Sequence, residues 1–405
     1  MPLPSAPTLT AQNPTTQATV QSGTAQQAPA QIPFTRAARK KSRLIGQYGP
    51  TTLATTANNL PPISIPANGY MRSLTLDITG TTSGNSAAVA FANDAPFNIL
   101  SGVAFFAANG DTILSQMDGF ALYALNKYGA FSTTGANDPL RDPTFSKTTG
   151  SGSTGGSFHF QIDIPLEFDA RDGAGALTNM AANQSFLLNL TLNTIANVYT
   201  TAPTSAPTVS ITITAKYWSA PTPANLQGIP QQQAPNNANL TSIVQVATPN
   251  VTPSTQQDIQ LPNVGNTIRS LIFIARTSSG ARTEVDWPGV FGLEVNNDTW
   301  EYLTKNNWRY QMAKQYDLFG GITAAPTLNS LDNGVYVYTG FISDGASGDD
   351  VVAGSSNRDL MLVTGSGTGL NINANTWGSG IASLQVLTNS LRIPDVASFY
   401  APMGI

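Results

Sequence analysis

The sequence lacks cysteine altogether and contains a single histidine, His159. The first absence excludes disulfides, thiolate metal sites and a cysteine nucleophile, and the second excludes a His-rich metal site. No run of 18 apolar residues occurs, so the sequence predicts no membrane-spanning helix. Residues 1–4 also lack the basic start and apolar core of a secretion signal. We therefore expect a protein that is made and folded without export.

Charge is scarce as well. Asp, Glu, Lys and Arg form 10% of the 405 residues, against about 25% in ordinary globular proteins. Ser, Thr, Asn and Gln number 135, with 35 Gly and 27 Pro. Helical bundles need charged faces and strong helix formers, whereas short strands joined by small polar turn residues need neither. The composition therefore predicts an all-β fold, and the length predicts two domains.

The few charges are unevenly placed along the chain. Residues 1–50 hold five basic side chains and no acidic one, whereas the remainder is net acidic. We predict a flexible arm over residues 1–34, rich in Thr, Gln, Ala and Pro, followed by a basic amphipathic helix over residues 35–50. The predicted functional residues of this helix are Arg36, Arg39, Lys40, Lys41 and Arg43.

Such a basic stripe indicates an anionic partner. The candidates are nucleic acid, a lipid headgroup surface, or the acidic face of a neighbouring subunit. The alternative is a helix that docks on its own domain and leaves its charged face in solvent.

From residue 60 onward the hydrophobic pattern changes to a period of two. Alternation predicts strands over residues 70–79, 158–164, 186–195 and 209–218. One stretch, residues 114–128, follows the helical period instead. A segment with four prolines and a Gln run, residues 221–238, is the predicted linker between a first domain at residues 51–220 and a second at residues 239–405.

The second half of the sequence repeats the first. Arg72-Ser73-Leu74 recurs as Arg269-Ser270-Leu271, and the turn at residues 109–112 recurs at residues 296–299. A helix-like stretch follows each turn, and strand-like segments follow in the same order. Each copy is about 170 residues, the size of an eight-stranded sandwich with one helical loop. The repeat predicts two tandem jelly-roll β-sandwiches with short loop helices.

With these features the chain resembles the double jelly-roll major capsid proteins of the tectivirus and adenovirus-hexon lineage, found in membrane-containing icosahedral phages. The resemblance implies a structural, non-enzymatic subunit that forms pseudo-hexagonal homotrimers in an icosahedral shell around an inner membrane and double-stranded DNA. It places the protein in the virion capsid after synthesis in the host cytoplasm. It also implies contacts with neighbouring capsomers, with penton and minor capsid proteins, and with membrane lipids through the N-terminal helix. Direct contact with DNA stays open.

Chemistry-bearing residues are few, and each has a structural interpretation. His159 lies on the polar face of its strand, and no Gly-x-Ser-x-Gly motif accompanies it. Carboxylates that are close in sequence, Glu167 with Asp169 and Glu284 with Asp286 and Glu294, resemble glycosidase acids but are more often surface groups. The loop with Asp344, Asp349 and Asp350 lacks EF-hand spacing, and Trp287, Trp300, Trp308 and Tyr310 suit a core or a subunit interface. We predict no catalytic residue, metal or cofactor.

Two other functions fit parts of the sequence. A secreted or surface binding module, such as an adhesin or a lectin-like protein, suits the low charge and the sequon-like Asn189-Leu190-Thr191. The missing export signal and the basic segment count against it. A jelly-roll carbohydrase needs a pair of catalytic acids that the sequence does not identify.

Overall fold

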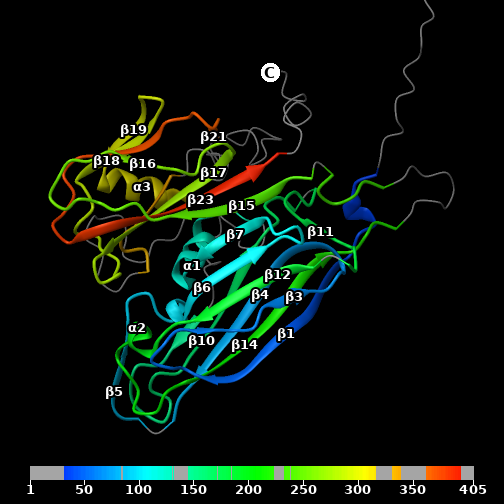
Figure 1. The fold of residues 1–405 in the computed structure, drawn as a ribbon, viewed down its shortest axis with the longest axis horizontal. Coiled ribbons are helices and arrows are strands. Elements are labelled where there is room, and N and C mark those ends of the chain that lie inside the picture. The colour runs from blue at the N-terminus through cyan, green and yellow to red at the C-terminus, as the bar shows by residue number, and fades with distance from the viewer. Residues whose placement is uncertain are drawn as a thin grey trace, which may run out of the picture.

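The computed structural model of the protein describes residues 32–83, 85–129, 131, 145–170, 172–183, 185–222, 232–237, 239–315, 331–338 and 362–393. Strands dominate these residues, and they gather into two sandwiches that lie side by side (Figure 1). The predicted arm at residues 1–34 and the acidic loop at residues 344–350 lie almost entirely outside the described residues.

The first sandwich consists of two main sheets. One has the order β1-β14-β4-β10-β8, with β11 pairing β4. Its strands are β1 (Lys40–Thr52), β14 (Thr208–Trp218), β4 (Gly69–Thr81), β10 (Phe158–Pro165), β8 (Phe145–Lys147) and β11 (Leu177–Asn179). The other places β2 (Asn58–Asn59) and β3 (Ile63–Ile65) beside β12 (Phe186–Leu192), followed by β6 (Leu100–Phe106) and β7 (Thr112–Met117). A small third sheet joins β13 (Tyr199–Thr201), β5 (Asn85–Phe91) and β9 (Gly150–Gly152).

The second sandwich has the same plan. Its longer strands run in the order β15 (Thr241–Ala247), β23 (Ile381–Arg392), β17 (Thr267–Thr277) and β20 (Val335–Tyr338), and β21 (Leu362–Val363) pairs β17. The opposite sheet has the order β16 (Ile259–Gln260), β22 (Leu370–Ala374), β18 (Val290–Val295) and β19 (Asp298–Thr304).

The two sandwiches match strand for strand. The order β1-β14-β4-β10 corresponds to β15-β23-β17-β20, and β3-β12-β6-β7 corresponds to β16-β22-β18-β19. The Arg-Ser-Leu repeat lies at the same place in β4 and β17. The predicted all-β fold of two tandem jelly rolls is confirmed, because each half has the eight-stranded, two-sheet arrangement of that fold.

One strand pair joins the two sandwiches into a continuous sheet. The last strand of the first sandwich, β7, runs parallel to the first strand of the second, β15, with Leu114 opposite Val244. Both side chains are buried. The sheet therefore continues from β2 in the first half to β20 in the second.

Alternation of apolar residues creates the core between the sheets. In β10, Phe158, Phe160 and Ile162 point inward, whereas His159 and Gln161 are exposed. The buried residues of the two sandwiches form one connected cluster. This contact across the junction buries apolar surface from both halves.

The helix predicted over residues 35–50 is wrong. A 3-10 turn, η1 (Phe34–Arg36), is followed by β1, which pairs with β14 from Lys40 to Thr52. The i, i+3, i+4 spacing of the basic residues fits a helix, but Gly46, Gly49 and Pro50 disfavour one. The edge of β14 offers backbone N–H and C=O groups for pairing, and pairing with them makes residues 40–52 a strand instead of a helix. The first sandwich therefore begins ahead of the predicted residue 51.

The helix predicted over residues 114–128 is shorter than expected. Residues 112–117 form β7, and α1 (Gly119–Tyr128) begins after Asp118, whose carboxylate accepts a hydrogen bond from the Ala121 amide at 2.7 Å. Such a cap satisfies a backbone donor that the first helical turn leaves open. In the second half, Trp300 and Leu303 lie in β19, and α3 (Lys305–Gln315) follows. The short helices η2 (Phe97–Ile99) and α2 (Ile195–Val198) complete the fold.

The close contact between α1 and η2 gives a prediction about Gly119. A Cβ at Gly119 would lie 2.0 Å from the Phe97 carbonyl oxygen. We expect Gly119→Ala to destabilise the protein by about 1–3 kcal/mol, because backbone must shift to make room. Urea unfolding followed by tryptophan fluorescence measures the change. Gly289→Ala is the control, since nothing lies within 4 Å of a Cβ there; equal stability of the two variants would contradict the predicted overlap.

Candidate functional site

The predicted basic residues lie at one end and along the outer edge of the first sandwich. Arg36 ends η1, Arg39 precedes β1, and Lys40, Lys41 and Arg43 lie within it. All five side chains are exposed, and none forms an ion pair with a residue that the structure describes. The structure thus keeps them together as an exposed basic segment that runs from η1 into the edge strand β1, and not along an α-helix.

A small apolar cluster fixes the start of this segment. The Phe34 ring is 1% exposed and packs edge-on against Trp218 at 5.1 Å between ring centroids. Ala38, Tyr70 and Ala176 complete the cluster. The Lys40 ammonium lies 5.3 Å from the centre of the Trp218 ring, within cation–π range. These contacts hold the basic segment at the end of the sandwich where β14 finishes.

A buried ion pair lies against Trp218 of this cluster. The Arg72 guanidinium contacts the Glu167 carboxylate at 2.5 Å, and the Trp218 indole N–H donates to the same carboxylate at 2.6 Å. Glu167 is fully buried. Its charge therefore holds Arg72 and Trp218 in place, rather than pairing with Asp169 as a catalytic acid.

The remaining candidate catalytic residues also have structural contacts. His159 lies 2.6 Å from Asp77 on the neighbouring strand, and both side chains are exposed. Glu284 is buried, where it contacts Arg309 at 2.8 Å and accepts a hydrogen bond from the Tyr336 hydroxyl at 2.6 Å. Burial raises the pKa of Tyr336, and the nearby Glu284 charge raises it further.

Asp286 and Glu294 have separate partners. Asp286 accepts hydrogen bonds from the Thr283 hydroxyl and the Gly380 amide, at 2.5 and 2.8 Å. Glu294, on β18, accepts a hydrogen bond from Asn373 at 3.4 Å. These carboxylates stabilise loops and strands, and none of the described contacts makes a pair of acids.

The aromatic residues singled out in the second half divide into two sets. Trp287 and Trp308 are buried, and each packs against Phe291. Trp300 and Tyr310 are 44% and 54% exposed. The first pair belongs to the core, whereas the second lies on the surface beside β19 and α3.

A group of charges between the two sandwiches was not predicted from the sequence. Asp94, in the loop after β5, pairs with Arg276 of β17 at 2.8 Å and with Arg282 just beyond it. Burial raises the pKa of Asp94, but the two guanidinium groups outweigh it and hold that pKa below its ordinary value. Arg282 also covers the Phe120 ring at 4.0 Å and donates to the Leu331 and Asn333 carbonyl oxygens.

Helix α1 takes part in the same junction along its length. At its start, Asp118 contacts Arg276 at 3.3 Å and accepts a hydrogen bond from Gln385 of β23 at 2.9 Å. Near its end, Lys127 pairs with the fully buried Asp332 of the second half at 2.9 Å. These contacts join residues up to 267 positions apart in sequence, which is why local motifs did not reveal them.

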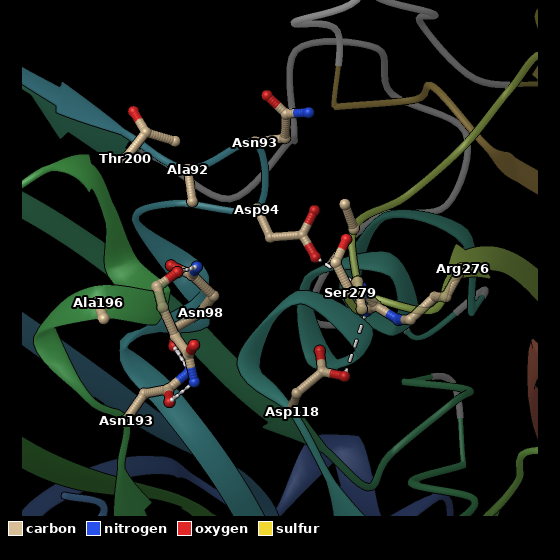
Figure 2. Close-up of a pocket in the computed structure, with 13 residues that line it drawn as sticks. Ala92, Asn93, Asp94, Asn98, Asp118, Asn193, Ala196, Thr200, Arg276 and Ser279 are labelled. Atoms are coloured by element: carbon tan, nitrogen blue, oxygen red, sulfur yellow. Dashed lines mark hydrogen bonds and ion pairs between the residues drawn. The ribbon is translucent and has the colours of Figure 1, made fainter. Parts of the chain in front are cut away.

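A cavity of about 520 Å³ opens beside this junction. Its walls come from both halves (Figure 2): Asp94 and Asp118 face Arg276 and Ser279 on one side, and Asn98 and Asn193 lie on the other. Arg276 is held by Asp94, Asp118 and Gln385, so the charges at the cavity wall are already compensated.

Within the described residues, no group of three or more His, Cys, Asp or Glu side chains is placed to hold a metal ion. The same residues include no helix of the length and hydrophobicity needed to cross a membrane. The acidic loop of Asp344, Asp349 and Asp350 lies outside the described residues.

The same strand order occurs once in each half, and the β7–β15 contact joins the two halves. Together these features define a double jelly roll. No family model matches the sequence, and no curated protein matches it. Solved structures do share the fold. The STIV major capsid protein superposes with a TM-score of 0.57 at 15% identity, over 90% of this chain and 99% of that one.

Two further structures support the same assignment. The Faustovirus major capsid protein gives a TM-score of 0.54 at 8% identity, over 88% of this chain and 90% of that one. PBCV-1 VP54, fitted into a reconstruction of the virophage Sputnik, gives 0.51 at 11% identity, over 87% and 93%. The fold of this protein is therefore that of the double jelly-roll major capsid proteins.

The junction charges give a second prediction. Asp94→Asn leaves two largely buried guanidinium groups without their shared carboxylate, and we expect a loss of about 3–5 kcal/mol of folding stability. Asp77→Asn, which breaks the exposed pair with His159, is expected to lower stability by less than about 1 kcal/mol. Urea unfolding of both variants tests the comparison. A similar small effect for both would show that the Asp94 cluster does not stabilise the junction.

Proposed function

We propose that this protein is a major capsid protein whose copies form homotrimeric capsomers of an icosahedral shell around an inner membrane and double-stranded DNA. The observation that carries the proposal is the duplicated jelly roll. Viral major capsid proteins share this fold over about nine-tenths of the chain. Three such chains supply six similar sandwiches, which suits six-sided packing.

The surface chemistry suits a shell subunit. Few charged side chains mean little like-charge repulsion when many copies pack edge to edge. Small polar residues hydrogen-bond across interfaces without burying full charges. Permanent interfaces of this kind bury about 2,000–5,000 Å², an area that the flat sides of two sandwiches can supply.

The basic segment supports an inward orientation of one end of the molecule. The Arg39 amide donates to the Ser219 hydroxyl just after β14, at 2.8 Å. Strand β15 begins and β23 finishes toward this same end of the molecule (Figure 1). We place this end of the capsomer toward the anionic headgroups of the membrane, since exposed Lys and Arg side chains next to such a surface are attracted to it. Penton and minor capsid proteins are the further partners of the assembled shell.

The solution mass tests the proposed assembly. We expect light scattering to give a stable species of about 128 kDa, three times the chain mass of 42.5 kDa. A 42.5 kDa monomer that persists as concentration rises would contradict the capsid assignment and favour a β-sandwich binding module instead.

Vesicle binding tests the orientation. We expect the double variant Arg36→Gln/Arg39→Gln to remain trimeric but to bind vesicles containing phosphatidylserine about thirtyfold less tightly, because each basic side chain near an anionic surface contributes about 1 kcal/mol. The control, Lys147→Gln/Lys305→Gln, changes net charge equally at a distance from the segment, because β8 is at the opposite edge of that sheet from β1 and Lys305 begins α3 in the second sandwich. Co-sedimentation at two salt concentrations measures both variants. Binding to duplex DNA but not to vesicles would assign the segment to nucleic acid and overturn the membrane orientation.

A further inference from the structure

The cavity beside the junction has the size of a ligand site. On the side of the first sandwich it is lined from the loop after β5, from η2 and α2, and from the capping residue of α1. The turn after β17 closes it on the side of the second sandwich (Figure 2). Its volume of about 520 Å³ lies within the roughly 300–1,000 Å³ of small-molecule sites. A small organic molecule therefore fits between the two sandwiches.

The walls of the cavity are polar. Four asparagines, two aspartates, an arginine, a serine and a threonine line it, and the other lining residues are three alanines and a glycine. Among the residues that the structure describes, the lining thus includes no aromatic or large aliphatic side chain. Sites for apolar ligands are lined mainly by such side chains. The composition of the walls therefore favours a ligand that binds through hydrogen bonds.

The charges in and behind the wall balance one another. The Arg276 guanidinium contacts Asp94 at 2.8 Å and Asp118 at 3.3 Å, and Arg282 supplies a second cation to Asp94. Two carboxylates thus face two guanidinium groups. An ionic ligand would bring an uncompensated charge next to these pairs or separate one of them, and both are costly in a partly buried site. The charge balance therefore favours a neutral ligand.

The same ion pairs hold the carboxylates in fixed positions as hydrogen-bond acceptors. An ionised carboxylate has about four acceptor positions on its two oxygens. At Asp94, Oδ2 accepts a hydrogen bond from Arg276 and Oδ1 accepts one from Arg282, so each oxygen keeps capacity for a second donor. A hydroxyl group that donates to a carboxylate forms a short and strong hydrogen bond. This wall is therefore suited to ligand hydroxyl groups.

The opposite wall carries a network of asparagines. The Asn98 side-chain amide donates to the Asn197 carbonyl oxygen at 2.7 Å, and the Asn193 amide donates to the Asn98 carbonyl oxygen at 2.8 Å. The Asn197 amide in turn donates to the Asn193 side-chain oxygen at 2.8 Å. Each of these bonds uses one of the two hydrogens on an amide nitrogen. Side chains fixed in this way lose little conformational freedom when they bind a ligand.

Hydroxyl groups match both walls because each one can donate and accept a hydrogen bond. Planar carboxylate, amide and guanidinium groups also place two polar atoms side by side, which suits a pair of neighbouring hydroxyls. The methyl groups of Ala92, Ala196 and Ala281 suit the C–H groups of a sugar ring. The geometry points to this cavity as a binding site for a neutral saccharide.

The site lies at the end of the molecule opposite the basic segment. Asn98 precedes β6, whereas the hairpin that follows β6 carries Asp111, which contacts Arg392 at the end of β23. With the basic end placed toward the membrane, the cavity opens outward. This outward direction rests on the proposed function, whereas the saccharide site itself does not. The saccharide is a free sugar or the terminal unit of a glycan on a cell surface, and the hydrogen-bonding chemistry is the same.

Saturation-transfer difference NMR on the full-length protein tests the site. The neutral probes are glucose, galactose, mannose and N-acetylglucosamine, each also as its methyl glycoside. We expect saturation transfer to at least one of them, because neutral hydroxyl-rich molecules match the walls. Glucuronic acid and glucosamine, which are charged at neutral pH, should give no transfer. A stronger signal from a charged probe than from every neutral one would overturn the neutral ligand class.

Blocking variants assign the signal to the cavity. Ala196→Phe on α2 and Ala281→Phe after β17 fill it from opposite walls, and both alanines are exposed, so the substitutions spare the core. We expect each variant to lower the transfer at least tenfold. Ala108→Phe is the matched control, because this exposed alanine lies in the turn beyond the other end of β6, whose seven residues span roughly 23 Å. Circular dichroism verifies that the three variants fold.

The outcomes separate the saccharide site from the capsid role. Absence of transfer to all the neutral probes would overturn the site, and so would a signal that persists in the folded blocking variants. Binding of a methyl glycoside would identify a glycan unit, since its anomeric position tolerates a link, whereas binding of the reducing sugar alone would identify a free saccharide. The solution mass tests the capsomer independently, so failure of the sugar site leaves the proposed function intact.

Discussion

The relative position of the two sandwiches depends on the charged cluster around helix α1. Asp94 holds Arg276 and Arg282 at one end of the helix, and Asp332 holds Lys127 at the other. Buried ion pairs add little net stability compared with apolar packing, but they penalise any arrangement that separates the partners. A purely apolar junction would tolerate sliding of one sandwich over the other. The cluster therefore fixes the orientation in which β7 meets β15, and with it the directions in which the remaining edges, β1 and β19, point.

Duplication explains why those two edges remain exposed. The first hairpin–helix unit, β7 with α1, packs against its own sandwich through β10, η2 and β6 and also contacts β17 of the second, and Ile113 and all of α1 are buried. Among the described residues no further sheet pairs with β19 of the second unit, and Trp300 and Tyr302 are 44% and 46% exposed. Exposed sheet edges invite uncontrolled pairing, and natural proteins protect them with charge or cover them. The basic residues at the start of β1 provide such charge against unspecific partners, yet they suit a neighbour whose edge is acidic.

The sequence predicted the fold well because its signals are periodic and repeated. Alternation located β4, β10, β12 and β14, and the recurrence of Arg-Ser-Leu and of the Asn-x-Asp-Thr turn revealed the duplication. The prediction failed where a helical spacing coincided with an open strand edge: residues 40–52 pair with β14, and no local pattern records that partner. The junction charges were missed for a similar reason, since Asp94 and Arg282 are 188 residues apart and neither lies in a motif. Grouping of the basic residues was predictable, whereas their placement along a sheet edge was not.

The distribution of charge connects the fold to assembly. Only 19 basic and 23 acidic residues occur in the chain, and several of them neutralise one another inside the molecule, at Arg72 with Glu167, at Arg309 with Glu284 and in the α1 cluster. The exterior is therefore formed largely by small neutral side chains, which can approach another copy closely without desolvating ions. Against that background the exposed segment from Arg36 to Arg43 places five basic side chains within eight residues and no acidic one. A group of like charges so confined attracts an anionic surface more strongly than the neutral exterior around it does, and this contrast is what would orient the subunit on the headgroup surface proposed above.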